Sequence, residues 1–261
     1  MQKLKLLFRY LYYYLRATNA HGVHSPFVFD LLTTVIYGNK HYYAFTKINR
    51  IRKKNLENHT LIPVQDFGAG SLHSNASSKK ISQLAQQAAK SQKYAELLFR
   101  LVNRFAPETI LELGTSLGIS GMYLASACKK SRFVSIEASI EIAKIAEQNF
   151  KDLHLQNTTV LHGTFEAKLT DAIQQLGKLN FVFFDGNHRK EPTLNYFKDC
   201  LNYCTNESVF VFDDIHWSTE MEEAWSEIKN HPEVTVTLDL FFIGIVFFRK
   251  EQAKENFIIR Y

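Results

Sequence analysis

From residue 109 onward the sequence alternates short apolar runs with longer amphipathic segments, and this alternation restricts the fold more than any other feature. The run Phe181-Val182-Phe183-Phe184 is apolar at every position, which is typical of a strand buried on both faces of a parallel sheet. Comparable runs, each followed by a helical pattern, predict strands at residues 109–113, 132–137, 158–161, 181–185 and 209–213. Two more predicted strands, 234–238 and 241–248, follow each other almost directly, which indicates an antiparallel hairpin.

This order of elements predicts an α/β fold. We expect a doubly wound, seven-stranded, mostly parallel sheet with an antiparallel C-terminal hairpin, as in Rossmann-like proteins. The first hundred residues lack the alternation and show helical periodicity instead, for example over 1–20 and 93–105. We therefore expect a helical N-terminal extension or lid at residues 1–105 and an α/β domain at residues 106–261. The chain has 261 residues, 46% of them apolar, which suffices for a core of that size.

The first predicted strand runs into a glycine-rich turn, Glu112-Leu113-Gly114-Thr115-Ser116-Leu117-Gly118. In open α/β sheets ligands bind beyond the carboxyl ends of the strands, and glycines let the backbone approach a ligand closely. The dinucleotide fingerprint would require glycines at positions 114, 116 and 119. Ser116 and Ile119 stand at two of these positions, so the sequence disfavours an NAD(P)-dependent oxidoreductase.

The Glu-x-Gly-x-x-x-Gly spacing of this turn resembles the cofactor turn of class I S-adenosylmethionine-dependent methyltransferases. The resemblance implies S-adenosylmethionine as cofactor. Glu137 ends the second predicted strand, where its carboxylate would accept hydrogen bonds from the ribose hydroxyls. The loop after the third strand would lie against the adenine. The predicted cofactor residues are Glu112, Gly114, Thr115, Ser116, Gly118, Glu137, Ala138, Gly163, Thr164, Phe165 and Asp185.

A second glycine-rich stretch, Asp66-Phe67-Gly68-Ala69-Gly70, has a similar acidic-glycine pattern. No acid-terminated strand follows it at a suitable distance, and the segment after it is polar rather than amphipathic. We interpret this stretch as a loop over the active site or as a surface turn.

Acidic residues end the fourth and fifth predicted strands: Asp185 follows one, and Asp213 and Asp214 follow the other. Neighbouring strands would bring these carboxylates together, and crowded carboxylates repel one another unless a cation joins them. Oxygen ligands with open positions suit Mg²⁺. The alternative that Asp185 and Asp213 are strand-end caps, or that Asp185 contacts cofactor or substrate without a metal, stays open.

These strand ends resemble those of the metal-dependent O-methyltransferases of the catechol and caffeoyl-CoA type, and of the related group with Asp-Gly-x-His after strand four. The resemblance implies Asp185, Asp213 and Asp214 as metal ligands, although Asp214 replaces the asparagine of the catechol type. His188 stands where that type has its lysine base, so Asp185 and His188 are the predicted catalytic residues. A neutral imidazole can accept a hydroxyl proton near pH 7.

The predicted reaction is methyl transfer to a small molecule, on a hydroxyl oxygen, with Mg²⁺ assistance. Enzymes that methylate amino groups of nucleic-acid bases often carry an (Asp/Asn)-Pro-Pro-aromatic motif after strand four, and Asp185-Gly186-Asn187-His188 stands there instead. Nucleic acid is therefore disfavoured as a partner. Two alternatives are kept: an RNA methyltransferase, and a non-catalytic protein that binds S-adenosylmethionine.

Three cysteines with no Cys-x-x-Cys pair favour a reducing, cytoplasmic location over a disulfide framework. Residues 1–16 combine Lys3, Lys5, Arg9 and Arg16 with leucine and tyrosine, and they are fewer than the ~20 that a spanning helix needs. This segment is expected to pack on the main domain or to lie on a membrane surface. The sequence leaves the oligomeric state open.

Overall fold

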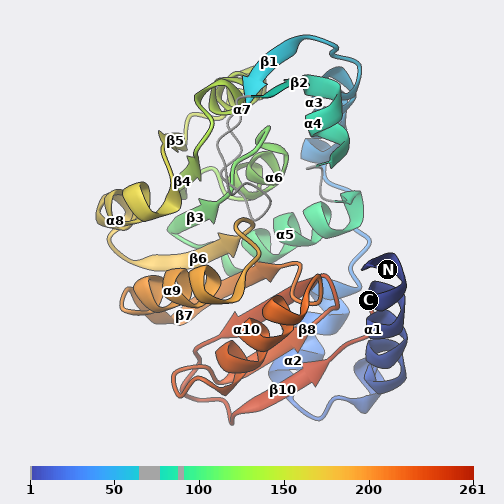
Figure 1. The fold of residues 1–261 in the computed structure, drawn as a ribbon. Helices are drawn as coiled ribbons and strands as arrows, with labels where there is room; N and C mark the ends of the chain where they lie inside the picture. The colour runs from blue at the N-terminus through green and yellow to red at the C-terminus, as the bar shows by residue number, and fades with distance from the viewer. Residues whose placement is uncertain (1, 65–76, 88–90) are drawn as a thin grey trace. The chain divides into compact units, whose positions relative to one another are not determined.

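The computed structural model describes residues 2–64, 77–87 and 91–261, and it divides the chain into two compact units. We call Met1–Gly38 together with Asn180–Tyr261 the terminal unit, and Asn39–Leu179 the middle unit (Figure 1). The principal sheet has eight strands in the hydrogen-bonded order β10-β8-β9-β7-β6-β3-β4-β5. A separate two-stranded sheet pairs β1 with β2 in antiparallel register.

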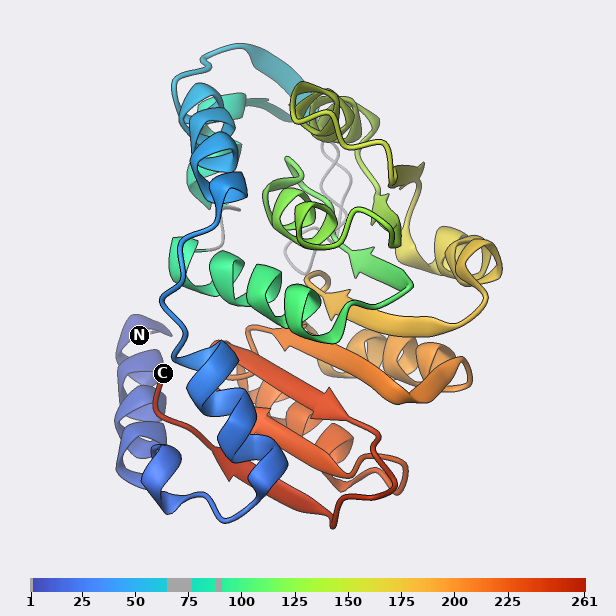
Figure 2. The same ribbon diagram turned by 180° about the vertical axis from the view of Figure 1, so that it is seen from behind.

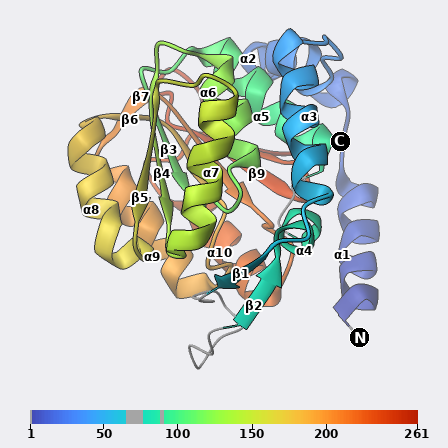
Figure 3. The same ribbon diagram turned by 90° about the horizontal axis from the view of Figure 1, so that it is seen from above.

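The middle unit contains the first strands of the principal sheet and their helices. Its elements are α3 (Tyr43–Leu56), β1 (Leu61–Val64), β2 (Ser77–Lys80), α4 (Ile81–Gln87), α5 (Gln92–Phe105), β3 (Thr109–Leu113), α6 (Ile119–Ala127), β4 (Arg132–Glu137), α7 (Ile140–Asp152), β5 (Thr158–His162) and α8 (Phe165–Leu176). Strand β4 pairs in parallel with β3 and with β5. Helix α8 packs against β3 and β4, while α7 packs against β4 and β5 (Figure 3). Every residue of β3 is buried, including the polar Thr109 and Glu112.

The terminal unit holds both ends of the chain. It contains α1 (Gln2–Arg16), a short helical turn (Ala20–Gly22), α2 (Pro26–Leu31), a wider helical turn (Leu32–Ile36), β6 (Leu179–Phe184, where the units join in sequence), α9 (Lys190–Leu201), β7 (Cys204–Asp213), α10 (Thr219–Asn230), β8 (Val236–Asp239), β9 (Ile243–Phe247) and β10 (Glu255–Ile258). Strand β9 pairs antiparallel with both β7 and β8, and β10 pairs in parallel with β8.

Helices cover both faces of this part of the sheet, and two residues of β9 show why. Gly244 and Phe247 are three positions apart, so they point to opposite faces of the strand. A Cβ at Gly244 would lie 2.7 Å from the ring of Trp225 on α10. Phe247 meets the ring of Phe27 on α2 edge-on, with 5.1 Å between the ring centroids. Helices α10 and α2 therefore lie on opposite faces (Figures 1 and 2).

The predicted fold class is confirmed: a mostly parallel sheet with an antiparallel hairpin and an N-terminal helical region. The predicted number of seven strands was wrong. The eighth strand, β10, begins with the exposed polar residues Glu255 and Asn256, which gave no apolar run to recognise. The predicted division at residue 105 does not coincide with the units, which meet at residues 38/39 and 179/180, and it stays a prediction.

Residues 65–76 lie outside the described part of the chain, and so does the second glycine-rich stretch at 66–70. Among the residues that the structure describes, no helix is both long and apolar enough to cross a membrane.

Candidate active site

The turn after β3 has a backbone that glycine favours. Gly114, Ser116 and Gly118 all have positive φ, at 106°, 47° and 74°. A Cβ at Gly118 would lie 3.0 Å from the ring of Phe150 on α7, so a side chain there would be both strained and crowded. Helix α6 starts directly after Gly118. The backbone N–H groups of a helix start favour polar or anionic ligand groups.

Glu137, at the end of β4, faces this turn. Its Oε2 accepts the backbone N–H of Ser116 at 2.8 Å, and its Oε1 accepts that of Ser139 at 2.9 Å. Burial raises the pKa of Glu137, while the backbone N–H groups of Ser139, Ser116 and Ala138 lower it in part. Each carboxylate oxygen has a second lone pair, so this side chain can still accept hydrogen bonds from a ligand.

Glu112 supports the turn from within the sheet. Its side chain is fully buried, and its Oε2 accepts the hydroxyl of Ser135 at 2.8 Å. The hydroxyl oxygens of Ser135 and Thr115 are 2.5 Å apart. Because Ser135 has one hydroxyl proton and gives it to the carboxylate, Thr115 is the donor between the two hydroxyls. Glu112 is thereby linked to the turn through two hydroxyl groups.

The end of β5 lies next to the end of β4. Gly163 has a φ of 148°, and its N–H donates to the backbone oxygen of Glu137 at 3.0 Å. Thr164 and Phe165 follow at the start of α8, and both are half-buried. The middle unit thus gathers the predicted residues Gly114, Thr115, Ser116, Gly118, Glu137, Ala138, Gly163, Thr164 and Phe165 at the carboxyl ends of β3, β4 and β5. We call these nine residues the cradle.

The terminal unit has an acidic group of its own at the ends of β6 and β7. One ligand atom each from Asp185, His188 and Asp213 lies within 4.8 Å of the other two. His188 Nε2 is 3.8 Å from Asp185 Oδ1. Asp213 is buried, whereas the other two side chains are half-buried. Two carboxylates and an imidazole at this separation are a donor set that can hold a divalent cation.

Asp214, which the sequence predicts as a third ligand, does not belong to this group. Its φ is 54°, and its backbone N–H donates to the oxygen of Phe242 at 2.7 Å. The left-handed backbone turns the chain between Asp213 and Asp214. The two adjacent aspartates therefore differ in environment.

The loop that carries His188 is held by contacts among Asn187, Tyr196 and Arg189, none of which was predicted as a site residue. Asn187 has a φ of 55°, and its side-chain amide donates to the hydroxyl of Tyr196 on α9 at 3.1 Å. Arg189 Nε donates to Asn187 Oδ1 at 3.1 Å. Asparagine tolerates the left-handed region better than most residues, so Asn187 was the one local indication of a tight turn before His188.

Residues 111–215 match the family model described as a methyltransferase domain. The predicted resemblance to methyltransferases is confirmed. The matched segment runs from the strand before the cradle to the end of the acidic group. A comparison with curated proteins gives no match.

Solved structures with the same fold include several methyltransferases. A Podospora anserina methyltransferase with S-adenosylhomocysteine bound is 13% identical, with a TM-score of 0.61 over 87% of this chain and 97% of that one. The O-methyltransferase of Streptomyces achromogenes involved in tomaymycin synthesis, solved with S-adenosylmethionine, is 18% identical, with a TM-score of 0.57 over 85% and 94%. A Bacillus cereus O-methyltransferase with S-adenosylhomocysteine is 20% identical, with a TM-score of 0.53 over 81% and 93%.

Proposed function

We propose that this chain is an S-adenosylmethionine-dependent methyltransferase that acts on a hydroxyl oxygen of a small molecule. The observation that carries the proposal is the carboxylate of Glu137 held against the turn at Ser116, 2.8 Å from its N–H. A half-buried acid at this place, beside a glycine turn without the dinucleotide spacing, suits a nucleoside with free ribose hydroxyls and no pyrophosphate. The methyltransferase-domain match and the cofactor-bound structures of the same fold support it.

The residues of the cradle would divide the work of binding the cofactor. Glu137 would accept the ribose hydroxyls, and residues 163–165 would lie against the adenine. Glu112 is fully buried and bonded to Ser135, so we propose that it acts by holding the turn. Asp185 as a further cofactor contact stays a prediction.

Asp185, Asp213 and His188 would hold a divalent cation. A bound cation would orient an acceptor hydroxyl and lower its pKa. The sequence assigns the third ligand to Asp214 and the role of base to His188. The 4.8 Å grouping favours His188 as the third ligand instead. Because imidazole binds transition metals better than Mg²⁺, this donor set should prefer Mn²⁺ over the predicted Mg²⁺.

The three cysteines, Cys128, Cys200 and Cys204, are free thiols. Burial raises the pKa of Cys204 to about 11, so that thiol is protonated and unreactive near neutral pH. Free thiols are consistent with the proposed cytoplasmic location.

The decisive experiment is calorimetric titration of the intact chain with S-adenosylhomocysteine and, separately, with NAD. The proposal expects binding of the first and none of the second. Transfer of a labelled methyl group from S-adenosylmethionine to a panel of phenols and alcohols then tests catalysis. Binding without transfer to any acceptor would favour the non-catalytic alternative. Label appearing in RNA rather than in small molecules would favour the RNA alternative.

A further inference from the structure

Helix α1 packs on the terminal unit through one of its faces. Tyr13 is buried, and it forms a small apolar cluster with Ala17 and Phe241, against which Leu6 also packs. The ring of Tyr10 stands edge-on to that of Phe241, with 5.0 Å between centroids. The hydroxyl of Tyr13 donates to the backbone oxygen of Ile259. This inner face anchors the helix beside the C-terminal segment.

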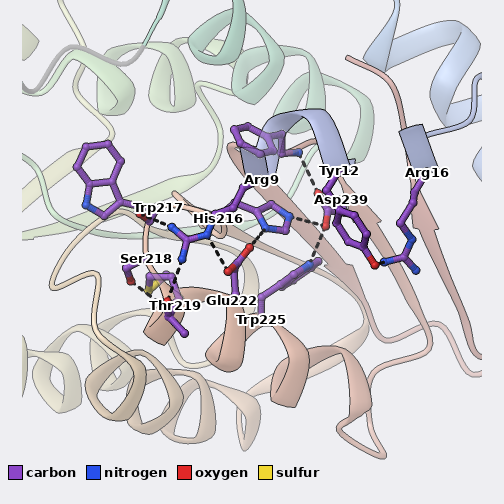
Figure 4. A network of polar contacts seen from close by, with 12 residues as sticks. Arg9, Tyr12, Arg16, His216, Trp217, Ser218, Thr219, Glu222, Trp225 and Asp239 are labelled. Atoms are coloured by element: carbon purple, nitrogen blue, oxygen red, sulfur yellow. Dashed lines mark hydrogen bonds and ion pairs between the residues drawn. The ribbon is translucent and has the colours of Figure 1, made fainter. Parts of the chain in front are cut away.

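A polar anchor on the same side fixes the rotation of α1. Arg9 Nε donates to Glu222 Oε2 at 2.9 Å, and its other nitrogens reach Thr219 Oγ1 at 2.9 Å and the backbone oxygen of Trp217 at 3.3 Å (Figure 4). Glu222 also bonds His216. These three contacts of the Arg9 guanidinium hold the helix in one orientation. The face opposite Tyr13 and Arg9 is therefore turned away from the terminal unit.

The outward face carries a continuous apolar stripe. Leu4, Phe8, Leu11 and Leu15 are separated by four, three and four positions, which places them on one side of a helix. Their side chains are 58%, 63%, 48% and 83% exposed. Among the described residues, α1 carries more exposed large apolar side chains than any other element. A stripe of this kind marks a surface that meets another apolar phase.

The charges of α1 decide between the candidate occupants. The helix contains Lys3, Lys5, Arg9 and Arg16 and no acidic residue; Arg9 is already paired with Glu222, whereas Lys5 and Arg16 are exposed. Pairing α1 with α1 of a second copy would bring cations together without an anion from either helix, which is unfavourable. An anionic lipid surface supplies the missing charge. Tyr12 and Tyr14, both exposed, have the apolar ring and polar tip that suit a headgroup layer.

We propose that α1 is a lipid-surface helix, which lies flat on an anionic bilayer with Leu4, Phe8, Leu11 and Leu15 inserted among the headgroups. The inner face keeps the helix attached to the terminal unit while the outer face binds. This inference rests on the faces of α1 and is independent of the proposed methyl transfer.

The test is co-sedimentation of the full chain with vesicles of phosphatidylcholine alone and of phosphatidylcholine mixed with phosphatidylglycerol. We expect binding to the mixed vesicles, weakened by added salt, and little binding to the neutral ones. The double substitution Phe8→Gln and Leu11→Gln should reduce the partition coefficient at least about tenfold. Phe29→Gln on α2 is the matched control, since Phe29 is 46% exposed elsewhere in the same unit.

Charge is tested separately. Lys5→Glu should weaken binding to mixed vesicles about fivefold or more, while the exposed Lys129, changed to Glu, should have no effect. If the chain bound neither the mixed nor the neutral vesicles, the proposal would be overturned. So would a dimer, seen by analytical ultracentrifugation, that Phe8→Gln with Leu11→Gln dissociates, because the stripe would then belong to a second copy of this chain.

Discussion

The carboxylate of Glu137 accepts a 2.8 Å hydrogen bond from the backbone N–H of Ser116, which joins the end of β4 to the turn after β3. Ser116 has a φ of 47°, in the left-handed region that costs a non-glycine residue about 1 kcal/mol or more. The bond from Glu137 therefore stabilises a turn that serine alone would not prefer. One side chain both shapes the cradle and offers its remaining lone pairs to a ligand.

Glu137→Ala should weaken binding of S-adenosylhomocysteine by about 1–3 kcal/mol, because hydrogen bonds to a charged acceptor are lost. Calorimetry of the two proteins at neutral pH measures the difference. Glu141→Ala is the control, since Glu141 pairs with Lys144 on the surface of α7. Unchanged affinity in the Glu137 variant, with its melting temperature preserved, would contradict the ribose role.

Gly121, on the first turns of α6, is packed too closely for any side chain. A Cβ there would lie 2.9 Å from Phe150 Cζ, 3.0 Å from Glu112 Oε2 and 3.0 Å from Phe133 Cζ. Gly121→Ala should lower the free energy of unfolding by about 1–3 kcal/mol through overpacking, despite the better helix propensity of alanine. Urea denaturation measures this change.

A second substitution, at Phe150, should relieve the crowding caused by Gly121→Ala. Phe150→Leu removes ring atoms that the new methyl group would meet, so the double variant should be more stable than the sum of the single effects predicts. Phe197→Leu, which shortens a buried ring in the terminal unit, should give no such rescue. Additive effects for Gly121 with Phe150 would show that the alanine is accommodated in another way.

The sheet was predictable from local sequence because its central strands are buried on both faces. Phe181 to Phe184 are apolar at every position, β3 has three apolar residues in five, and each strand is followed by a helix. Strand β10 was not predicted, because it lies at the sheet edge and its first residues are exposed. An edge strand is held by hydrogen bonds to a single neighbour, so its sequence need not show an apolar run.

The candidate sites were predictable only where their residues stand at strand ends. Glu137 and Asp213 are the last residues of β4 and β7, Asp185 directly follows β6, and the sheet topology places all three at carboxyl ends of strands. The placement of Asp214 was not predictable, because the left-handed backbone turns the chain beside Asp213. Arg9 and Glu222 are 213 positions apart in the sequence, so no local pattern indicates their contact.

His188 and Asp214 make different predictions about metal binding. Because His188 belongs to the group with Asp185 and Asp213, His188→Ala should weaken Mn²⁺ binding at least about tenfold, measured by calorimetry or electron paramagnetic resonance. Asp214→Asn should leave Mn²⁺ affinity unchanged. The intact protein should lose methyl transfer in excess EDTA and regain it with Mn²⁺.

The alternative role for His188 gives a separate signature. A base that is not a ligand would lose about 10²–10⁴-fold in kcat when replaced, with Mn²⁺ affinity intact and the low-pH limb of the rate profile removed. Full activity in EDTA would exclude the metal proposal altogether. Weakened Mn²⁺ binding in Asp214→Asn would restore the ligand set predicted from the sequence.

His216 lies between two carboxylates beneath α1. Its Nδ1 is 3.0 Å from Glu222 Oε1, and its Nε2 is 2.9 Å from Asp239 Oδ2. The ring stacks on Phe241 with 5.2 Å between centroids. Burial lowers the pKa of His216, but the hydrogen bonds and charges of Asp239 and Glu222 outweigh burial and raise it overall. Arg9 also pairs with Glu222, and Lys229 interacts electrostatically with Asp239.

A histidine whose pKa is raised on folding stabilises the protein most below its unfolded pKa of about 6.5, and the contribution is lost as pH rises through the folded pKa. The stability difference between the parent protein and His216→Gln should therefore be largest below about pH 6.5 and shrink as the pH is raised. Urea denaturation across this range measures it. His231 is the control of opposite sign, because burial lowers its pKa, so its protonation destabilises the fold as pH falls. A parent–His216→Gln difference that stays constant with pH would show that His216 does not gain a proton between Glu222 and Asp239.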